Sequence, residues 1–379
     1  MDFDLTAQQQ ARYDDVLAAV RARLGTVREQ AGSYFSRDDW KTAADIGLVG
    51  LCLPTDSGGG GLGALDTALC LEAFGHGCPD TGFVFSISAH LLACAVPVRD
   101  FGDSPAAERL LAGLASGELV AANAMTEDAA GSDVGQLAVT ADRVGDDYVL
   151  NGDKSFASNG PAADVFITYA VTNPSAGFLG ITAFAVPAGT AGVEVGPPLG
   201  KLGLASCPAS RVAFRECRVP VAYRLGSEGQ GSVIFQHSMA WERGCLFAAY
   251  LGLMERQLQQ CTEHARRRRQ FGRAIGDFQA ISHRIIGMRQ RLESSRLLLY
   301  RACWLLDGGR DHTTAVALAK IAVSEAAVAN SIDAVQIFGG AGYLTATGVE
   351  QQLRDSIPAT IFSGTNEIQR EIIAREARL

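Results

Sequence analysis

Residues 231–276 read GSVIFQHSMAWERGCLFAAYLGLMERQLQQCTEHARRRRQFGRAIG, and the rest of the chain is organised around them. The stretch contains no proline. Its large apolar residues recur at steps of four and seven, at positions Phe235, Met239, Leu246, Tyr250, Met254 and Leu258. This spacing predicts one apolar stripe along a long helix.

One acidic residue interrupts the stripe. Glu242 follows Met239 by three residues and precedes Leu246 by four, so its carboxylate faces the same side as the core residues. Burial raises the pKa of a carboxyl group, and a buried carboxylate with a raised pKa suits a general base. The alternative is that Glu242 pairs with an arginine of another helix as part of the packing. This stretch alone leaves both interpretations open.

Composition narrows the class of protein. A chain of 379 residues suits two or three domains, and 47% apolar with 20% charged residues is typical of a soluble globular protein. The formal net charge of −8 argues against nucleic acid as a partner. The nine cysteines form no CxxC pair and show no metal-ligand spacing. With no signal peptide and no run long enough to cross a bilayer, we expect a cytoplasmic protein without a metal or a membrane partner.

The hydrophobic period changes twice along the chain. We predict the fold class α+β, with an N-terminal helical domain over residues 1–118, an antiparallel β-barrel or sandwich domain over 119–226 and a C-terminal four-helix bundle over 227–379. Helices are expected at 8–31, 38–47, 64–74, 82–95, 106–116, 278–306, 313–339 and 364–379, besides the long one. Strands are expected at 138–143, 148–151, 164–172, 181–186 and 211–214, with a turn at Asn151-Gly152.

Two local patterns allow either a structural or a ligand-binding interpretation. Gly58, Gly60 and Gly63 match the dinucleotide-binding pattern, but the flanks look helical, so we interpret 54–63 as a flexible loop. The basic run Arg266–Arg269 is either a solvated helix end or a site for a phosphorylated ligand.

Five polar or glycine-rich segments are only suggestive singly, but together and in this order they resemble the acyl-CoA dehydrogenase family of flavoproteins. The segments are MTEDAAGSD (125–133), NGDKSFASNG (151–160), RRQFGRAIGDFQA (268–280), QIFGGAGY (336–343) and RDSIPATIFSGTNEIQR (354–370). The expected domain order matches the helical, β and helical-bundle order of that family.

The resemblance implies FAD between the β domain and the C-terminal bundle. Phe156 would cover the flavin ring where most relatives have tryptophan, and Ser158 would take the place of a threonine near flavin N5. A distal set would reach the FAD of another subunit, which implies a homo-oligomer, in this family usually a tetramer. The implied FAD contacts are Met125, Thr126, Gly131, Ser132, Phe156, Ser158, Thr365 and Glu367, with Arg268, Gln270, Phe271, Gln279, Gln336, Gly339 and Gly340 in the distal set.

The chain departs from the family at its catalytic base. Many members carry a glutamate in an E-G-T motif, where this chain has Ser363-Gly364-Thr365. A minority place the base on the long helix just before an arginine, and Glu242-Arg243 occupies that position. The resemblance therefore implies Glu242 as base and the Ser363 amide as donor to the thioester carbonyl, with Ser132, Arg243 and Gly364 contacting substrate.

Within the family, the chain is most similar to the L-prolyl-carrier-protein dehydrogenases of pyrrole-forming pathways. The resemblance lies in MAWERGCLFAAYLGLMERQL (239–258), HARRRRQFGRAIGDFQAISHRI (264–285) and IFSGTNEIQREIIARE (361–376). It implies oxidation of proline held as a thioester on a peptidyl carrier protein, with an electron-transfer flavoprotein or oxygen reoxidising the flavin. A short or branched acyl-CoA dehydrogenase and a non-catalytic flavin-binding protein are the alternatives.

Overall fold

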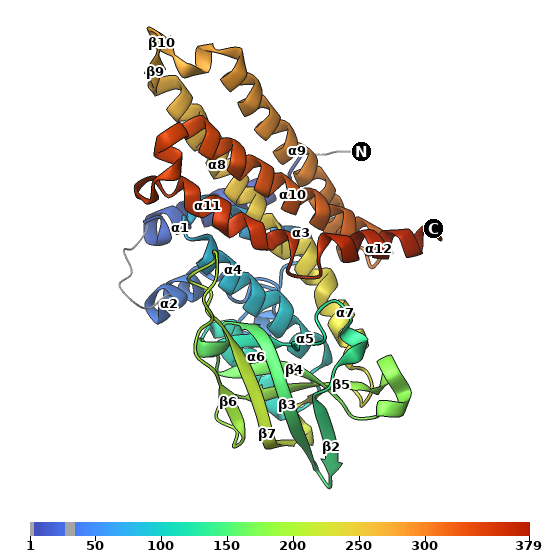
Figure 1. Cartoon of the computed structure of the whole chain (residues 1–379). Helices are drawn as coiled ribbons and strands as arrows, with labels where there is room; N and C mark the ends of the chain where they lie inside the picture. The colour runs from blue at the N-terminus through green and yellow to red at the C-terminus, as the bar shows by residue number, and fades with distance from the viewer. Residues whose placement is uncertain (1–3, 27–34) are drawn as a thin grey trace.

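The computed structural model describes residues 4–26 and 35–379 and shows a helical part above a β-sheet part (Figure 1). The N-terminal region is helical, as expected, but the helix predicted over 8–31 ends at Leu24, and 27–31 lie outside the described residues. Its helices are α1 (Ala7–Leu24), α2 (Arg37–Ile46), α3 (Ala64–Gly77), α4 (Thr81–Ala89), α5 (Val96–Phe101) and α6 (Pro105–Ser116), with a π-helical segment His90–Ala95 between α4 and α5.

The loop at 54–63, predicted to be flexible with helical flanks, follows a run of turns and precedes α3, so only its second flank is helical. Gly60 N–H donates to the Gly50 carbonyl at 2.9 Å and Gly61 N–H to the Leu53 carbonyl at 2.8 Å. These backbone bonds close the segment into a defined turn.

Two helical stretches contradict the expectation that none could span a bilayer. Thr81–Phe101 and Thr313–Tyr343 are long and apolar enough by length and composition. The apolar window of the first is entirely buried within the protein, which is the pattern of a core helix.

The strands of the middle region form one mixed sheet in place of the expected antiparallel barrel or sandwich. Within the described residues the path is β6-β7-β3-β2-β4-β5-β8, with β1 added beside β4 in parallel, Ala121 opposite Val165. The turn predicted at Asn151-Gly152 is wrong, because Gly152 lies inside β3 at a register shift with φ of 135°. The strands are β1 (Ala121–Ala124), β2 (Thr140–Val144), β3 (Asp147–Ser158), β4 (Val165–Val171), β5 (Ile181–Pro187), β6 (Val193–Val195), β7 (Ala209–Pro220) and β8 (Arg224–Leu225).

The helices of the C-terminal region pack as a bundle, but the long helix is not continuous. A π-helical segment, Glu242–Leu246, separates α7 from α8, and a short hairpin follows α8. The elements are α7 (Gly231–Trp241), α8 (Ala248–Arg267), β9 (Arg269–Gln270), β10 (Arg273–Ala274), α9 (Gln279–Asp307), α10 (Thr313–Phe338), α11 (Val349–Ser356) and α12 (Asn366–Glu376).

The N-terminal helices and the C-terminal bundle share one apolar core, which holds the π-helical segment in place. Two glycines allow α3 and α8 to approach closely: an added Cβ at Gly75 or at Gly252 would lie 2.1 Å from a backbone oxygen of the facing helix. This contact packs α3 directly against the helix that follows Glu242.

Candidate active site

Glu242 begins the π-helical segment and is only 6% exposed. A π turn closes its backbone hydrogen bonds over five residues in place of four and often occurs at functional sites. Burial raises the pKa of the Glu242 carboxyl group, while the Ser363 hydroxyl and the charge of Arg243 lower it in part. Glu242 is therefore a buried carboxylate on the predicted apolar stripe, with a proton affinity above that of an exposed glutamate.

The partner of Glu242 is Ser363, not an arginine of another helix. The Ser363 hydroxyl donates a hydrogen bond to Glu242 Oε1. Glu242 Oε2 is buried and has no hydrogen-bond partner among the described residues. The two oxygens of the carboxylate are thus in different environments.

Ser363 has a left-handed backbone, with φ of 56°, which is uncommon for a residue other than glycine. Its carbonyl accepts hydrogen bonds from Arg243 Nε at 2.9 Å and from Gln369 Nε2 at 3.3 Å. Gly364 follows with φ of 83°, and the Thr365 hydroxyl caps α12 by accepting from Ile368 N–H at 3.3 Å. These contacts hold the loop that faces Glu242.

Aromatic rings close the same region. The Phe362 ring lies 4.6 Å from that of Phe85 and 5.3 Å from that of Phe247, measured between centroids. Beneath Phe247 lies the buried Lys320, which donates to Asn366 Oδ1 at 2.7 Å, and burial lowers its pKa to about 8. Sequence reasoning missed Phe85, Phe247 and Lys320 as site residues, because side chains on separate helices give no signal of a shared site.

Two further buried groups lie close enough to Glu242 to be affected by its charge. Burial, with a smaller contribution from the Glu242 charge, raises the pKa of the Cys94 thiol and of the Tyr169 phenol. Tyr169 Oη is buried and makes no hydrogen bond within the described part of the chain. Both groups are neutral near pH 7, so Glu242 is the group of this set that can accept a proton.

The predicted FAD loop at 125–133 follows β1, and a buried lysine beneath the loop holds it in place. Lys154 Nζ, fully buried, pairs with Glu127 Oε1 at 2.8 Å and donates to the Met125 carbonyl at 3.0 Å. This leaves Gly131 and Ser132 exposed, with open space at the Cα of Gly131. Thr126 is half-buried at the beginning of the loop.

Phe156 lies on β3 next to this loop, since the neighbouring Ser155 N–H donates to the Thr126 carbonyl at 2.7 Å. The Phe156 side chain is 62% exposed and its φ is 57°. Ser158, at the end of the same strand, is half-buried. An uncovered aromatic ring beside a polar loop fits a planar group such as a flavin.

The distal set lies at the far end of the molecule from the sheet (Figure 1). Phe271, at the tip of the β9-β10 hairpin, is 92% exposed. The His264 ring stacks on Phe338 at 4.1 Å and joins the ends of α8 and α10. Within one chain the sheet-side residues and this distal set are not brought together. All members of the set are exposed: Arg268, Gln270, Phe271, Gln279, Gln336, Gly339 and Gly340.

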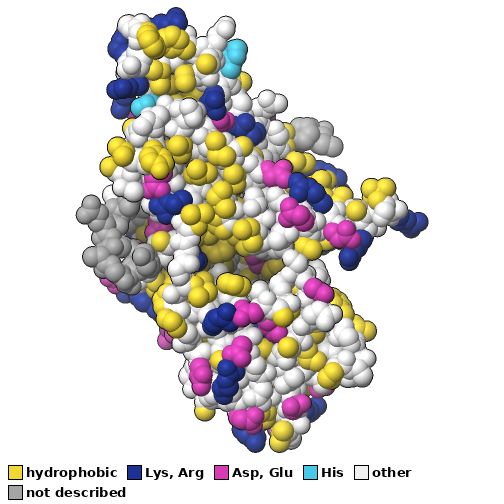
Figure 2. Space-filling model, in the orientation of Figure 1, with side chains coloured by type: hydrophobic (Ala, Val, Ile, Leu, Met, Phe, Trp, Pro, Cys, Tyr) yellow, Lys and Arg dark blue, Asp and Glu magenta, His cyan; other side chains and the backbone are white. Residues whose placement is uncertain are grey.

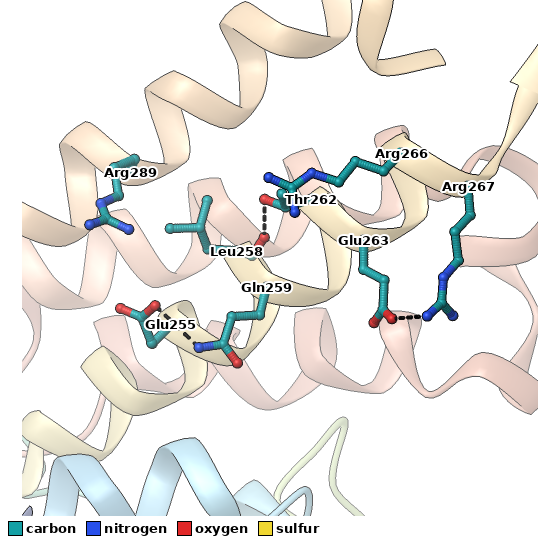
Figure 3. A pocket seen from close by; sticks show the side chains of 8 residues that line it. All are labelled: Glu255, Leu258, Gln259, Thr262, Glu263, Arg266, Arg267 and Arg289. Carbon is teal, nitrogen blue, oxygen red and sulfur yellow. Dashed lines mark hydrogen bonds and ion pairs between the residues drawn. The ribbon is translucent and has the colours of Figure 1, made fainter. Parts of the chain in front are cut away.

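Two arginines of the basic run, Arg266 and Arg267, lie outside the distal set, whereas Arg269 is on β9 next to Arg268. Arg266 and Arg267 line a groove of about 600 Å³ with Arg289 and two glutamates (Figure 3). Arg267 pairs with Glu263 in this groove. The mixed charges favour a solvated helix end over a phosphate site there.

Among the predicted cofactor residues, Glu367 is exposed at the beginning of α12.

Hydrophobic side chains gather across the middle of one face, where the helical part meets the sheet part (Figure 2). Exposed apolar patches of this kind mark sites for ligands or partners.

Comparison with known proteins matches three family descriptions in sequence. Acyl-CoA dehydrogenase N-terminal domain matches residues 6–118, the middle domain matches 122–217 and the C-terminal domain matches 229–377. The chain is 51% identical to an L-prolyl-[peptidyl-carrier protein] dehydrogenase of Pseudomonas fluorescens, over 100% of both chains. It is 45% identical to the protein of the same description from a Serratia strain, over 100% of this chain and 99% of the other.

A solved structure described as PigA with FAD and proline is 43% identical, covers 100% of both chains and superimposes with a TM-score of 0.92. The ordinary acyl-CoA dehydrogenases compared are more distant, with 38% identity for one from Bacillus subtilis over 87% of this chain and 86% of the other. On this sequence and structural similarity, the chain belongs to the acyl-CoA dehydrogenase family.

Proposed function

We propose that this protein is an FAD-dependent dehydrogenase that oxidises an L-prolyl thioester on a peptidyl carrier protein to the pyrrole-2-carboxyl thioester. One observation carries the proposal: a buried glutamate, Glu242, presents beside the Ser363 loop an oxygen that has no hydrogen-bond partner among the residues described. Relatives at 51% and 45% identity, both described as L-prolyl-[peptidyl-carrier protein] dehydrogenases, support this substrate over free acyl-CoA.

The protein groups perform the proton chemistry. Glu242 removes the proton on the carbon next to the thioester carbonyl, and its buried position raises its affinity for that proton. The Ser363 N–H donates to the thioester oxygen, on which negative charge develops as the proton leaves. Arg243 fixes this donor by binding the Ser363 carbonyl at 2.9 Å. Ser132 and Gly364 complete the proposed substrate contacts.

The sheet-side residues Met125, Thr126, Gly131, Ser132, Phe156 and Ser158, with Thr365 and Glu367, would hold the flavin portion of FAD. When bound, FAD supplies the two-electron acceptor that takes the hydride at N5. Forming a pyrrole removes four hydrogens from the prolyl ring, so two rounds of oxidation are needed. An electron-transfer flavoprotein or oxygen then takes the electrons.

We further propose a homo-oligomer, a tetramer as is usual in the family, in which the distal set of one subunit completes the FAD site of another. The exposure of all seven residues of that set and their distance from the sheet support this arrangement (Figure 1). The nine cysteines are free and buried, which suits a reducing, cytoplasmic setting.

The test is the intact mass of a carrier protein loaded with L-proline, before and after incubation with the purified holoenzyme. We expect the loss of four hydrogens, and no loss with Glu242→Gln. An unchanged carrier with flavin bleaching by a short acyl-CoA would overturn the prolyl assignment and favour acyl-CoA oxidation. A flavin that neither substrate reduces would mark a non-catalytic flavin-binding protein.

A further inference from the structure

The residue that replaces the usual family glutamate is in direct contact with the base. The Ser363 hydroxyl donates a hydrogen bond to Glu242 Oε1, while Oε2 is buried and has no hydrogen-bond partner among the described residues. An unsatisfied buried carboxylate oxygen is unfavourable and calls for a ligand or a reaction to explain it.

Consecutive residues hold Ser363 from two sides. Glu242 accepts the hydrogen bond from its side chain, and Arg243 donates one to its carbonyl at 2.9 Å. Both belong to the π-helical segment, whose wider turn differs from the α-helix on either side. The left-handed backbone of Ser363 persists because these contacts hold it, and such strain is concentrated at functional sites.

We propose that the Ser363 hydroxyl is a positioning group that fixes Glu242 Oε1 and thereby makes Oε2 the atom that removes the substrate proton. The inference rests on the proposed function for the identity of the substrate. In this step the substrate C–H bond breaks and the proton forms an O–H bond with Glu242 Oε2. The electron pair of the broken bond stays on the substrate, which becomes the enolate. Ser363 keeps its own proton and changes only the orientation and basicity of Glu242.

The charges around Glu242 make this role measurable by pH. Arg243 faces the base from its own segment, Cys94 from the π-helical segment after α4, and Tyr169 from β4. The thiol and the phenol have raised pKa values and stay neutral in the acid range, and Arg243 stays charged. Lys320 on α10, whose pKa is lowered to about 8, also changes charge near the site. The shift of the acid limb between the Ser363 variants and the wild type, and not the limb itself, therefore reports protonation of Glu242.

The experiment compares S363A and S363G with the wild-type holoenzyme on the substrate that the wild type oxidises. Both variants lose the hydroxyl, but only glycine adopts the left-handed backbone without strain. We expect kcat/KM to fall by roughly 10- to 100-fold in both, as for a misplaced base. The acid limb of the kcat/KM profile should move to higher pH in both, because the Ser363 hydrogen bond lowers the Glu242 pKa.

A second measurement needs no substrate. Infrared titration of the holoenzyme follows the carboxylic acid band that E242Q removes, and we expect this band to persist to higher pH in S363A and S363G. If the band and the acid limb stay at their wild-type pH in both variants, the hydroxyl does not act on Glu242 and the proposal is wrong. A rate loss in S363A that S363G restores would assign the effect to the backbone instead. A wild type inert toward the loaded carrier would overturn the proposed substrate, while the infrared result would still decide the role of Ser363.

Discussion

The carboxylate of Glu242 is buried, and within the described part of the chain one of its oxygens has no hydrogen-bond partner while the other accepts from the Ser363 hydroxyl. Replacing it with glutamine keeps the shape of the side chain and removes the proton acceptor. We expect E242Q to retain its flavin and to lose roughly 100- to 10,000-fold in kcat, the usual contribution of a positioned base. Stopped-flow flavin reduction with the loaded carrier measures this.

The matched control is E371Q, since Glu371 is exposed on α12 and pairs only with Arg375 among the described residues. Equal rates for E242Q and wild type would remove Glu242 from the mechanism.

His90 gives a second prediction at the scale of one residue. Its Nδ1 accepts from Ala121 N–H at 3.0 Å, which leaves Nε2 to donate to the Leu114 carbonyl at 3.2 Å, and burial lowers its pKa to about 4. Between the unfolded pKa of about 6.5 and this value, only the unfolded chain binds the proton. Stability is therefore full above pH 6.5 and falls by up to about 3 kcal/mol as pH drops toward 4.

Thermal melting of the wild type and H90N at pH 7 and pH 5 tests this linkage. H90N starts from a lower Tm, because it loses two buried contacts, but its Tm should fall less between the two pH values. Parallel decreases in the two proteins would show that other groups cause the acid sensitivity.

The sequence was sufficient to single out Glu242, because one carboxylate on an apolar stripe is a local signal. Ser363 could be noted only through its place in a family motif, and its contact with Glu242 could not be foreseen. The two residues are 121 positions apart, and their contact depends on the backbone φ of Ser363 and on the π turn. Phe85, Phe247, Cys94 and Tyr169 could not be predicted for the same reason, since each comes from a different element.

At the scale of elements, β3 carries a buried cation whose purpose is visible only in the fold. Lys154 pairs with Glu127, whose two oxygens also accept from the N–H groups of Ala138 at 2.7 Å and Val139 at 3.1 Å. The pair thus joins the beginning of the predicted FAD loop to the backbone at Ala138 and Val139, which follow the loop. Removing one partner leaves a buried charge unpaired, so we expect K154M to destabilise the protein by about 3–5 kcal/mol.

The double variant E127Q/K154M should recover most of that loss, because it leaves no unpaired charge. Chemical unfolding, monitored through the release of bound flavin, measures the free energy of unfolding of both variants. A double variant no more stable than K154M would mean that the lysine acts through packing and not through its pairing with Glu127.

Whether a segment is a helix or a strand could be predicted from its hydrophobic period. Interruptions within a helix or a strand could not. The helix predicted over 313–339 agrees with α10 (Thr313–Phe338), whereas the π turn at Glu242 leaves no mark in the apolar stripe. The strand predicted at 148–151 extends to Ser158 as β3, because pairing with β7 carries it through a glycine bulge. Tertiary pairing thus overrode a local turn signal.

At the scale of the whole molecule, the exposed hairpin tip makes a prediction about assembly. A 92% exposed phenylalanine contributes little to the stability of an isolated chain, but it would be buried against a partner in the proposed oligomer. We expect F271S to bind flavin less tightly and to shift toward smaller species. Light scattering and flavin absorbance across a sizing column measure both. The control V144S changes another exposed residue, on β2, and should leave both unchanged. An F271S protein with wild-type mass and flavin content would contradict the shared site.

The separation of the sheet-side residues from the distal set has a genetic consequence. One allele damaged only at Ser158 and another damaged only at Arg268 would each give inactive homo-oligomers in the proposed arrangement. In a cell that carries both, random pairing across a two-fold axis would unite two intact halves at roughly a quarter of the sites. Activity would then return although neither copy of the gene is functional, so that two lesions in one gene would complement each other as if they lay in two.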